Sequence, residues 1–416
     1  MKKKKIIDYK ISRFSSVGSL EANYVKKITK SGILSDYMGK AGKNFLGGEI
    51  VKKFEKKIEN YFNVKYAITV NSWTSGLISI FGAIGLSPGD EVIMPNWTMS
   101  ACAMSVIHWN AIPIFVDIED KTFNIDPDKI EAKITNKTKA ILVVDIFGHP
   151  ADYKKLNRIA KKYKLKIISD SAQSIGSKYN NKFTGTFSLA GGYSFNCHKH
   201  INTGEGGVIL TNSKKIATRA RLIRNHAESS LNQKYTNKSE LINMIGYNFR
   251  LGELESAIGI CQLQKLKKII ELRRKFAFKL SQGLSNLKGL RLPIIKKNCT
   301  HSFYTYPIIL KLDELKVSRS YICKLLRNEG VNISEGYVNL HSLPIFKHKI
   351  GYGNKNFPWS LNGSKKYIYK DGDYPVSENL HKKSLIHLSM YTLDYKLKDI
   401  DNIIKCFQKV WKKIKN

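Results

Sequence analysis

The chain lacks any long apolar run. No stretch of about 18 consecutive apolar residues occurs among its 416 residues, so no membrane-spanning helix is expected. The first eight residues are basic, but no apolar core or small-residue cleavage site follows them, so we expect no secretory signal. With 42% hydrophobic residues, the chain can still bury a large core and divide into two domains.

Cysteine is scarce. The six cysteines are scattered, form no CxxC pair and belong to no His/Cys cluster at the spacing of a zinc site. We therefore expect reduced thiols, a cytoplasmic location and no metal. Cys102, Cys261 and Cys323 stand in apolar runs, which predicts that they are plain core residues.

Acidic residues are also few. The chain has 33 Asp and Glu but 70 Lys and Arg, which gives a net charge of +37. Such a charge can indicate a nucleic-acid or anionic-membrane partner. The lysines are nevertheless spread along nearly the whole chain, and no aromatic-plus-basic RNA motif, zinc finger or basic-zipper pattern is present. We expect no nucleic-acid partner, and a basic surface that favours phosphorylated, anionic substrates.

Short β-branched runs alternate with helical patterns from about residue 62 onward. This alternation predicts a mainly parallel sheet of seven strands covered by helices on both faces, an α/β fold. The expected strands are 66–70, 91–94, 112–118, 140–147, 166–169, 192–195 and 207–210, and the expected helices are 74–84, 100–108, 127–134 and 153–163.

The remaining segments predict three parts. Residues 1–45 have amphipathic character but weak periodicity, and are expected to form an N-terminal arm against the second domain or a partner. Residues 46–288 form the large domain, which ends in a long helical stretch from 253 to 284. Residues 289–416 read as a smaller α+β domain, with a strand at 306–310, a helix at 318–329 and a loop from 336 to 373.

The most informative residue is Lys199, within a glycine-rich stretch between two strands, residues 192–207. A lysine in a glycine-lined pocket can form an imine with an aldehyde cofactor, and Asp170, at a neighbouring strand end, can keep a cofactor ring nitrogen protonated. The pair indicates pyridoxal 5′-phosphate (PLP). Without that context, a solvated loop cation is the simpler interpretation of Lys199.

Two further segments support a cofactor site. Residues 71–77 follow a strand and open a helix, and a helix N-terminus binds anions such as a phosphate; simple helix capping by Ser72 or Thr74 is an alternative that is compatible with this role. The strand near residue 95 ends beside Trp97, which could cover one face of a planar ring or belong to the core.

Seven motifs in fixed order resemble the DegT/DnrJ/EryC1/StrS family. Its members are PLP enzymes of fold type I, the aspartate-aminotransferase-like fold, and aminate keto sugars carried on nucleotides. The resemblance runs from about residue 46 to 263, resumes weakly at 336–337 and 374–378, and is closest to the perosamine-synthase-like branch at 97–99 and 198–200. The motifs are Asn-Ser-x-Thr-Ser-x-Leu (71–77), Pro-Gly-Asp-Glu-Val-Ile-x-Pro-x-x-Thr (88–98), Phe-Val-Asp-Ile (115–118), Asp-x-Ala-Gln (170–173), Ser-Phe-x-x-x-Lys (194–199), Gly-Glu-Gly-Gly (204–207) and Asn-Phe-Arg (248–250).

The resemblance implies the catalytic pair. Lys199 matches the lysine that forms the imine and then moves the proton during amino transfer, and Asp170 matches the carboxylate that pairs with the ring nitrogen. Gln173 matches the side chain beside the 3′ oxygen of the ring. A related branch has histidine at the lysine position and removes a hydroxyl group, so Lys199 favours transamination over dehydration.

The resemblance also implies a phosphate site and a shared dimer site. The phosphate ligands are Ser194, Thr74 and the backbone of Trp73, where most members have glycine. Asn248 matches a phosphate ligand given across a dimer interface, which implies a homodimer with shared active sites. Met99 stands where many members have an aromatic residue stacked on the ring, so the stacking role falls to Met99 or to Trp97.

Three residues are candidates for substrate binding. His198, like its neighbour His200, could tune Lys199 or meet a substrate phosphate. Arg250 could bind the glutamate carboxylate or a phosphate, and His341 aligns roughly with a family loop that approaches the sugar nucleotide. A structural role is the alternative for His198 and for Arg250.

The expected reaction moves an amino group from L-glutamate to a nucleotide-linked keto-deoxysugar, most simply a 4-keto sugar, for surface-glycan biosynthesis. Three alternatives remain open from the sequence: transamination of another anionic ketone such as a small phosphorylated ketose, a PLP-dependent sugar dehydratase, and a regulator that kept the fold without the activity.

Overall fold

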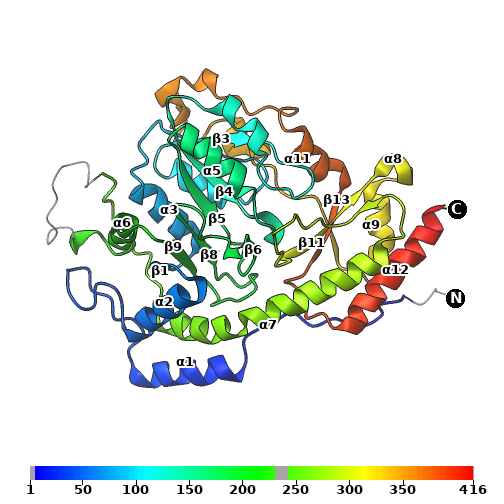
Figure 1. Ribbon diagram of the computed structural model, residues 1–416, viewed down its shortest axis with the longest axis horizontal. Helices are drawn as coiled ribbons and strands as arrows, with labels where there is room; N and C mark the ends of the chain where they lie inside the picture. The colour runs from blue at the N-terminus through cyan, green and yellow to red at the C-terminus, as the bar shows by residue number, and fades with distance from the viewer. Residues whose placement is uncertain (1–4, 230–241, 416) are drawn as a thin grey trace.

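The computed structural model describes residues 5–229 and 242–415. Its central sheet has seven strands in the order β1-β9-β8-β5-β4-β2-β3, in which only β9 runs antiparallel to its neighbours (Figure 1). This arrangement confirms the predicted α/β fold. The strands are β1 (Tyr66–Val70), β2 (Glu91–Pro95), β3 (Ile112–Val116), β4 (Thr138–Val144), β5 (Lys166–Asp170), β8 (Ala190–Ser194) and β9 (Gly207–Thr211).

Helices cover both faces of this sheet, so successive strand residues are buried on alternate sides. On β4, Leu142 joins the cluster beneath α3 and α6, while its neighbour Val143 joins the cluster beneath α5. This double burial explains the continuously apolar strand sequences. The helices are α2 (Glu49–Phe62), α3 (Trp73–Ala83), α4 (Ala101–Ile107), α5 (Tyr153–Lys162), α6 (Lys214–Arg224) and α7 (Glu253–Leu284).

A second, four-stranded antiparallel sheet forms the smaller α+β unit, in the order β10-β11-β13-β12. Helix α7 reaches from the large sheet to this unit, where α12 packs against it (Figure 1). The exact domain boundaries given above stay a prediction. The elements are β10 (Leu290–Arg291), β11 (Thr305–Leu310), β12 (Ile333–Glu335), β13 (Leu385–Ser389), α8 (Leu312–Leu315), α9 (Arg319–Asn328) and α12 (Leu397–Lys415).

Two predicted segments differ from the structure. The helix expected at 127–134 is a pair of 3₁₀ turns, η1 (Pro127–Lys129) and η2 (Glu131–Lys133), which the backbone N–H groups of Ile130 and Ile134 close by donating three residues back. The loop expected at 336–373 contains short helical turns. They are η6 (Leu340–Ser342), α10 (Pro344–Lys347), η7 (Trp359–Asn362) and η8 (Ser364–Lys366).

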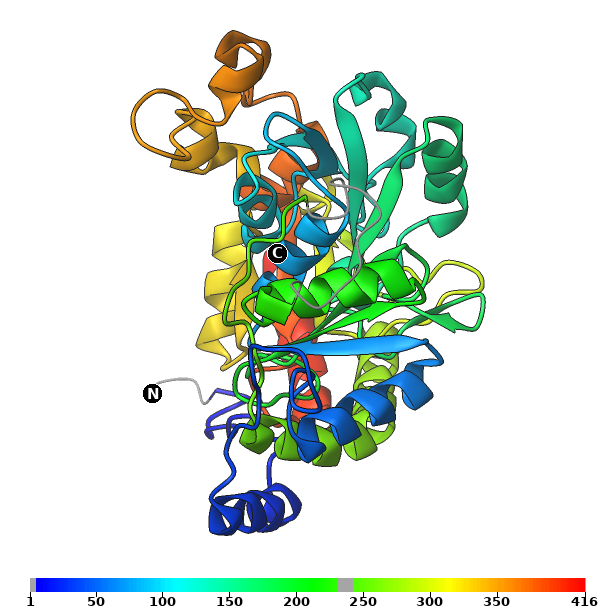
Figure 2. The ribbon, with the colours of Figure 1, turned by 90° about the vertical axis from the view of Figure 1, so that its left-hand side faces the viewer.

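The segment from 344 to 373 covers the edge of the sheet at β3 and projects at one end of the molecule (orange in Figure 2). The Tyr369 hydroxyl donates to the backbone oxygen of Pro113 (2.8 Å), and the Tyr367 hydroxyl donates to Glu91 (2.8 Å). Asn362 donates to the backbone oxygen of Gly89 (2.7 Å). An uncovered edge strand would offer unpaired backbone groups to other chains, so these contacts give the segment a protective role.

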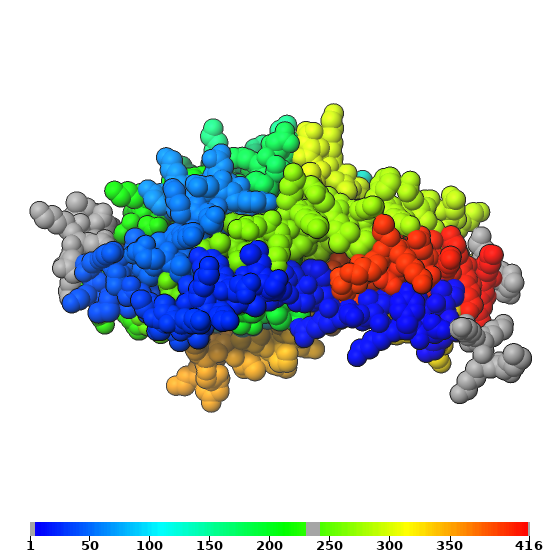
Figure 3. All heavy atoms as spheres, turned by 90° about the horizontal axis from the view of Figure 1, so that it is seen from below, coloured from blue at the N-terminus to red at the C-terminus, as the bar shows by residue number. Residues whose placement is uncertain are grey.

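The N-terminal arm lies along α7 and reaches the small unit, as Figure 3 shows from below. Its helix α1 (Ser19–Ser31) is held by Glu21, which pairs with Lys265 of α7 (2.6 Å). Farther along, the backbone N–H of Phe14 donates to Thr392 (3.1 Å). Within the described residues, no helix combines the length and apolar character needed to cross a bilayer.

Candidate active site

The predicted catalytic pair lies at the carboxyl edge of the large sheet, where ligands of such sheets bind. Strand β5 ends on Asp170 and its neighbour β8 ends on Ser194. The loop from β8 to β9 carries Lys199, and β1, on the other side of β9, leads directly into the N-terminus of α3. Four features separated in sequence therefore meet at one edge.

The carboxylate of Asp170 is buried and accepts three hydrogen bonds. Its Oδ1 accepts the indole N–H of Trp73 (2.8 Å) and the backbone N–H of Ala172 (3.0 Å). Its Oδ2 accepts the thiol of Cys102 (2.9 Å). A carboxylate has about four acceptor positions, so one position on Oδ2 is left for a further donor.

Lys199 lies near this carboxylate with its amine largely withdrawn from water. Desolvation lowers the pKa of Lys199 to about 8, although the nearby Asp170 carboxylate opposes the shift. The ammonium nitrogen lies 4.7 Å from the centroid of the Tyr304 ring, which stacks on Tyr391 at 4.4 Å. A lysine of this pKa supplies a neutral amine close to neutral pH, as a nucleophile and proton carrier requires.

Gln173 is fixed on both sides of its amide. Its Oε1 accepts the backbone N–H of Phe147 (2.9 Å), and its Nε2 donates to the Tyr337 hydroxyl (3.1 Å). Phe147 has a φ of 57°, an unusual value for a bulky residue and one often found at functional sites. Tyr337 lies 5.5 Å from the ring of Trp97, which connects Gln173 to the end of β2.

The N-terminus of α3 keeps two backbone donors free of helical partners. Ser72 caps the helix by accepting the N–H of Ser75 (3.1 Å), as capping predicts. The N–H groups of Trp73 and Thr74, the first two helical residues, have no acceptor inside the helix and can bind an anion. The buried indole of Trp73 turns towards Asp170.

Trp97 and Met99 differ sharply in exposure. Trp97 is fully buried in the main core beside Tyr337, and its Nε1 has no partner among the described residues. Met99 is 61% exposed at the start of α4. A side chain that stacks on a bound ring must be accessible from the site, and of these two side chains Met99 is the exposed one.

Asn248 and Arg250 form a separate group. The Nε of Arg250 donates to the Asn248 side chain (2.8 Å), and its guanidinium lies 5.8 Å from the Tyr37 ring. Asn71 donates to the backbone oxygen of Asn248 (3.3 Å), which places the group near the start of α3. Asn248 itself is exposed.

The two histidines beside Lys199 have different surroundings. His200 is fully buried, its Nε2 lies 2.9 Å from the Ser302 oxygen, and burial holds its pKa well below the ordinary value. Such a histidine stays neutral and serves the structure. His198 is exposed, with its ring 5.8 Å from Tyr391, so it remains available to a ligand.

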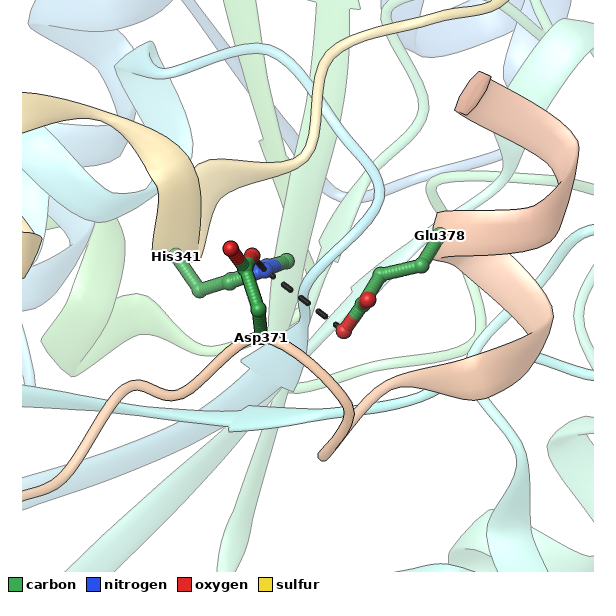
Figure 4. A group of neighbouring side chains, drawn as sticks. All are labelled: His341, Asp371 and Glu378. Carbon is green, nitrogen blue, oxygen red and sulfur yellow. Dashed lines mark hydrogen bonds and ion pairs between the residues drawn. The ribbon is translucent and has the colours of Figure 1, made fainter. Parts of the chain in front are cut away.

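His341 belongs to an ion-pair cluster drawn in Figure 4. Its Nε2 lies 3.0 Å from Asp371 and 3.6 Å from Glu378, and its Nδ1 lies 3.1 Å from Asn96, next to Trp97. The three ligand atoms lie within 4.8 Å of one another, close enough for a cation. Lys382 already supplies a positive charge 3.4 Å from Glu378 and 3.8 Å from Asp371. We therefore interpret the cluster as a set of contacts that holds η6 against α11 (Pro375–Asn379).

Three residues near Lys199 and Asp170 were not predicted from the sequence to lie at the site. Cys102 is buried, as expected of a core residue, but its thiol also contacts Asp170; burial raises its pKa, so the thiol stays protonated and can donate. Tyr304 and Tyr337 come from the second half of the chain. Only the weak motif at 336–337 could have indicated Tyr337, and no local pattern marks Tyr304.

Comparison with known proteins agrees with this geometry. A solved structure that shares the fold is PseC, an aminotransferase of Helicobacter pylori, 22% identical, with a TM-score of 0.79 over 97% of this chain and 100% of that one. Residues 38–384 match the DegT/DnrJ/EryC1/StrS aminotransferase family, and the chain belongs to that family.

Three relatives illustrate the range of the family. A GDP-perosamine synthase of Escherichia coli O157:H7 is 32% identical over 302 residues, 73% of this chain and 80% of that protein. A dTDP-3-amino-3,6-dideoxy-alpha-D-galactopyranose transaminase of Aneurinibacillus thermoaerophilus is 31% identical over 372 residues, 89% and 92% of the two chains. The solved GDP-4-keto-6-deoxymannose-3-dehydratase with a trapped PLP-glutamate geminal diamine is 25% identical, with a TM-score of 0.76 over 96% of this chain and 100% of that one.

The protein is a PLP-dependent aminotransferase. The residues at the sheet edge fit the cofactor, because they offer an amine, a carboxylate with one open acceptor position and the donors of a helix N-terminus. When bound, PLP supplies an aldehyde that condenses with amines and a ring that withdraws electrons.

Proposed function

We propose that this enzyme transfers the amino group of L-glutamate to a nucleotide-linked keto-deoxysugar, most simply at a 4-keto position, for surface-glycan biosynthesis. The observation that carries the proposal is the placement of Lys199, with its lowered pKa, beside Asp170 at the sheet edge. Relatives that make amino sugars on GDP and dTDP support the substrate class. A cytoplasmic location remains a prediction.

In this proposal, Lys199 and Asp170 are the catalytic residues. The amine of Lys199 holds the cofactor and moves the proton, while the open position on Asp170 Oδ2 takes the ring N–H. Gln173 lies beside the 3′ oxygen. The N–H groups of Trp73 and Thr74, with the Ser194 hydroxyl, bind the phosphate, and Met99 lies against the ring.

The substrate contacts are assigned more broadly. His198 is exposed next to Lys199, and we propose that it meets the substrate phosphates. Arg250 is held beside Asn248, where its charge suits a carboxylate or phosphate. His341 contacts Asn96 and thereby orders the loop that begins at Tyr337, so we propose that it affects substrate binding indirectly.

We propose a homodimer in which Asn248 completes the partner's phosphate site. Asn248 is exposed, as are Ile245 (56%), three residues earlier, and Met38 (49%), whose backbone oxygen accepts the amide of Asn225, the β-bridge partner of Asn248. Neighbouring exposed apolar side chains are typical of a surface that a partner covers. Under this proposal the single chain carries an incomplete site.

The alternatives gain less support. The relatives named above act on nucleotide-linked sugars, which does not favour a small phosphorylated ketose as the substrate. A dehydratase is disfavoured because Lys199 occupies the position where such a relative has histidine. The presence of Lys199, Asp170 and Gln173 together disfavours a regulator without activity.

The test is an assay of the glutamate-charged enzyme against a panel of GDP-, dTDP- and UDP-linked keto-deoxysugars and phosphorylated ketoses, with amino-sugar formation followed by mass spectrometry. We expect product from at least one nucleotide-linked 4-keto sugar and none with the Lys199→Ala control. Product from a phosphorylated ketose alone would contradict the proposed substrate class.

A further inference from the structure

The indole of Trp73 reaches Asp170 through a space that neighbouring glycines leave open. A Cβ at Gly76 would lie 2.8 Å from Trp73 Cε3, and a Cβ at Gly192 would lie 2.4 Å from Trp73 Cζ3. These glycines come from α3 itself and from β8, the strand beside β5. The indole therefore fills a slot between helix and sheet, and the slot points its N–H at the Asp170 carboxylate.

We propose that Trp73 is a positioning residue for the cofactor, which fixes the Asp170 carboxylate so that Oδ2 presents its one open acceptor position to the ring nitrogen. The proposal rests on the pairing of Asp170 with that nitrogen proposed above. Trp73 and Ala172 together occupy both positions on Oδ1, at 2.8 and 3.0 Å. The ring N–H is therefore left with Oδ2, which also accepts the thiol of Cys102.

Charge makes this hydrogen bond significant. A hydrogen bond to a buried carboxylate is stronger than one between neutral groups, because the low dielectric inside the protein screens it little. Trp73 is only 5% exposed and Asp170 is 6% exposed. Without the indole N–H, the carboxylate could rotate about its side-chain torsions, and its hydrogen bond to the ring nitrogen would weaken.

The test compares the dissociation constants of PLP and of an analogue in which carbon replaces the ring nitrogen. The analogue cannot pair with Asp170. The dissociation constant of the analogue divided by that of PLP therefore measures the pairing of the ring nitrogen alone. We expect Trp73→Phe, which keeps an aromatic ring but removes the donor, to reduce that ratio about tenfold, the scale of a hydrogen bond to a charged group.

Trp109→Phe is the matched control. The Trp109 indole is also buried and donates to the backbone oxygen of Ile78 (2.8 Å), but it does not contact Asp170. A general loss of core packing would lower the affinity for both cofactors equally in either variant. The ratio should therefore stay within about twofold of wild type in Trp109→Phe, since no charged pair is disturbed.

Two outcomes would overturn the proposal in distinguishable ways. If wild-type enzyme binds the two cofactors equally, the pairing of Asp170 with the ring nitrogen fails, and the role of Trp73 fails with it. If wild type discriminates and Trp73→Phe keeps the full ratio, only the role of Trp73 fails. Should Trp73→Phe not fold, Gly76→Ala displaces the indole instead, and an unchanged ratio in that variant would equally refute the proposal.

Discussion

The amine of Lys199 lies over the ring of Tyr304, 4.7 Å from its centroid. The ring shields the amine from water on one side, while Asp170 attracts its charge from another. Desolvation is the larger effect, so the pKa of Lys199 falls to about 8. The balance between these two neighbours sets the pH at which the amine becomes nucleophilic.

The first prediction concerns that pH. Because the pKa of Lys199 is lowered, labelling of Lys199 by trinitrobenzenesulfonate in cofactor-free enzyme should rise with pH and reach half its maximum near pH 8. Tyr304→Ala admits water, which should move the midpoint upward by about one unit, whereas Tyr304→Phe keeps the ring and should leave it unchanged. Peptide mapping by mass spectrometry measures the rate, and a midpoint above pH 10 in wild type would contradict the account.

The second prediction tests the shared site. Mixing Lys199→Ala and Asn248→Ala subunits should give about one-quarter of wild-type activity, because half of the dimers are hybrids and each hybrid has one intact site of two. Each variant alone should be inactive or strongly impaired. If Asn248 serves its own chain, every hybrid site carries a defect and the mixture should show no recovery.

The third prediction concerns a buried acid behind the site. Asp145 accepts hydrogen bonds from Tyr153 (2.8 Å) and Ser171 (2.6 Å), yet burial raises its pKa from 3.8 to about 6. A raised folded-state pKa stabilises the protein fully below pH 3.8, and this stabilisation is lost as the pH rises through about 6.

Asp145→Asn removes this titration. Relative to wild type, the variant should gain about 2.4 kcal/mol in free energy of unfolding between pH 4 and pH 7. Urea unfolding of both proteins at several pH values gives the difference. A difference that does not change with pH would show that Asp145 does not titrate in this range.

The fourth prediction addresses a buried ion pair. Arg224 is fully buried and pairs with Glu55 at 2.7 Å, and Glu55 also accepts the N–H and hydroxyl of Thr69 (both 2.9 Å). Glu55→Gln leaves the guanidinium without a countercharge, and should lower the free energy of unfolding by about 3 kcal/mol or more.

Adding Arg224→Met to Glu55→Gln should recover much of that loss, because the unpaired buried charge is gone. Thermal and urea unfolding of the single and double variants measure the effect. Equal stability of Glu55→Gln and wild type would show that the pair contributes little.

The sequence predicted the parts of the site that local patterns determine. Asp170 and Lys199 each stand at a strand end or in a glycine-rich turn, and the alternating pattern places both at one edge of the sheet. Residues that reach the site from distant segments left no such signal. Tyr304 lies 105 residues beyond Lys199, directly before β11, and contacts it only in the folded chain.

Trp73 illustrates the limit most clearly. Its backbone role follows from its place at a helix N-terminus, but the direction of its side chain depends on the space left by Gly76 and Gly192. The contact with Asp170 joins residues 97 positions apart. Cys102 is similar, since an apolar run correctly predicted its burial but could not show which group its thiol meets.

The most direct test of the central claim is the glutamate half-reaction of Lys199→Ala loaded with PLP. In wild type, glutamate should shift the visible absorption band of the bound cofactor toward the near ultraviolet within the time of a turnover. In Lys199→Ala the same conversion should be at least about a thousandfold slower, because the group that moves the proton is missing. A Lys199→Ala enzyme that keeps the band and converts glutamate at the wild-type rate would contradict the account.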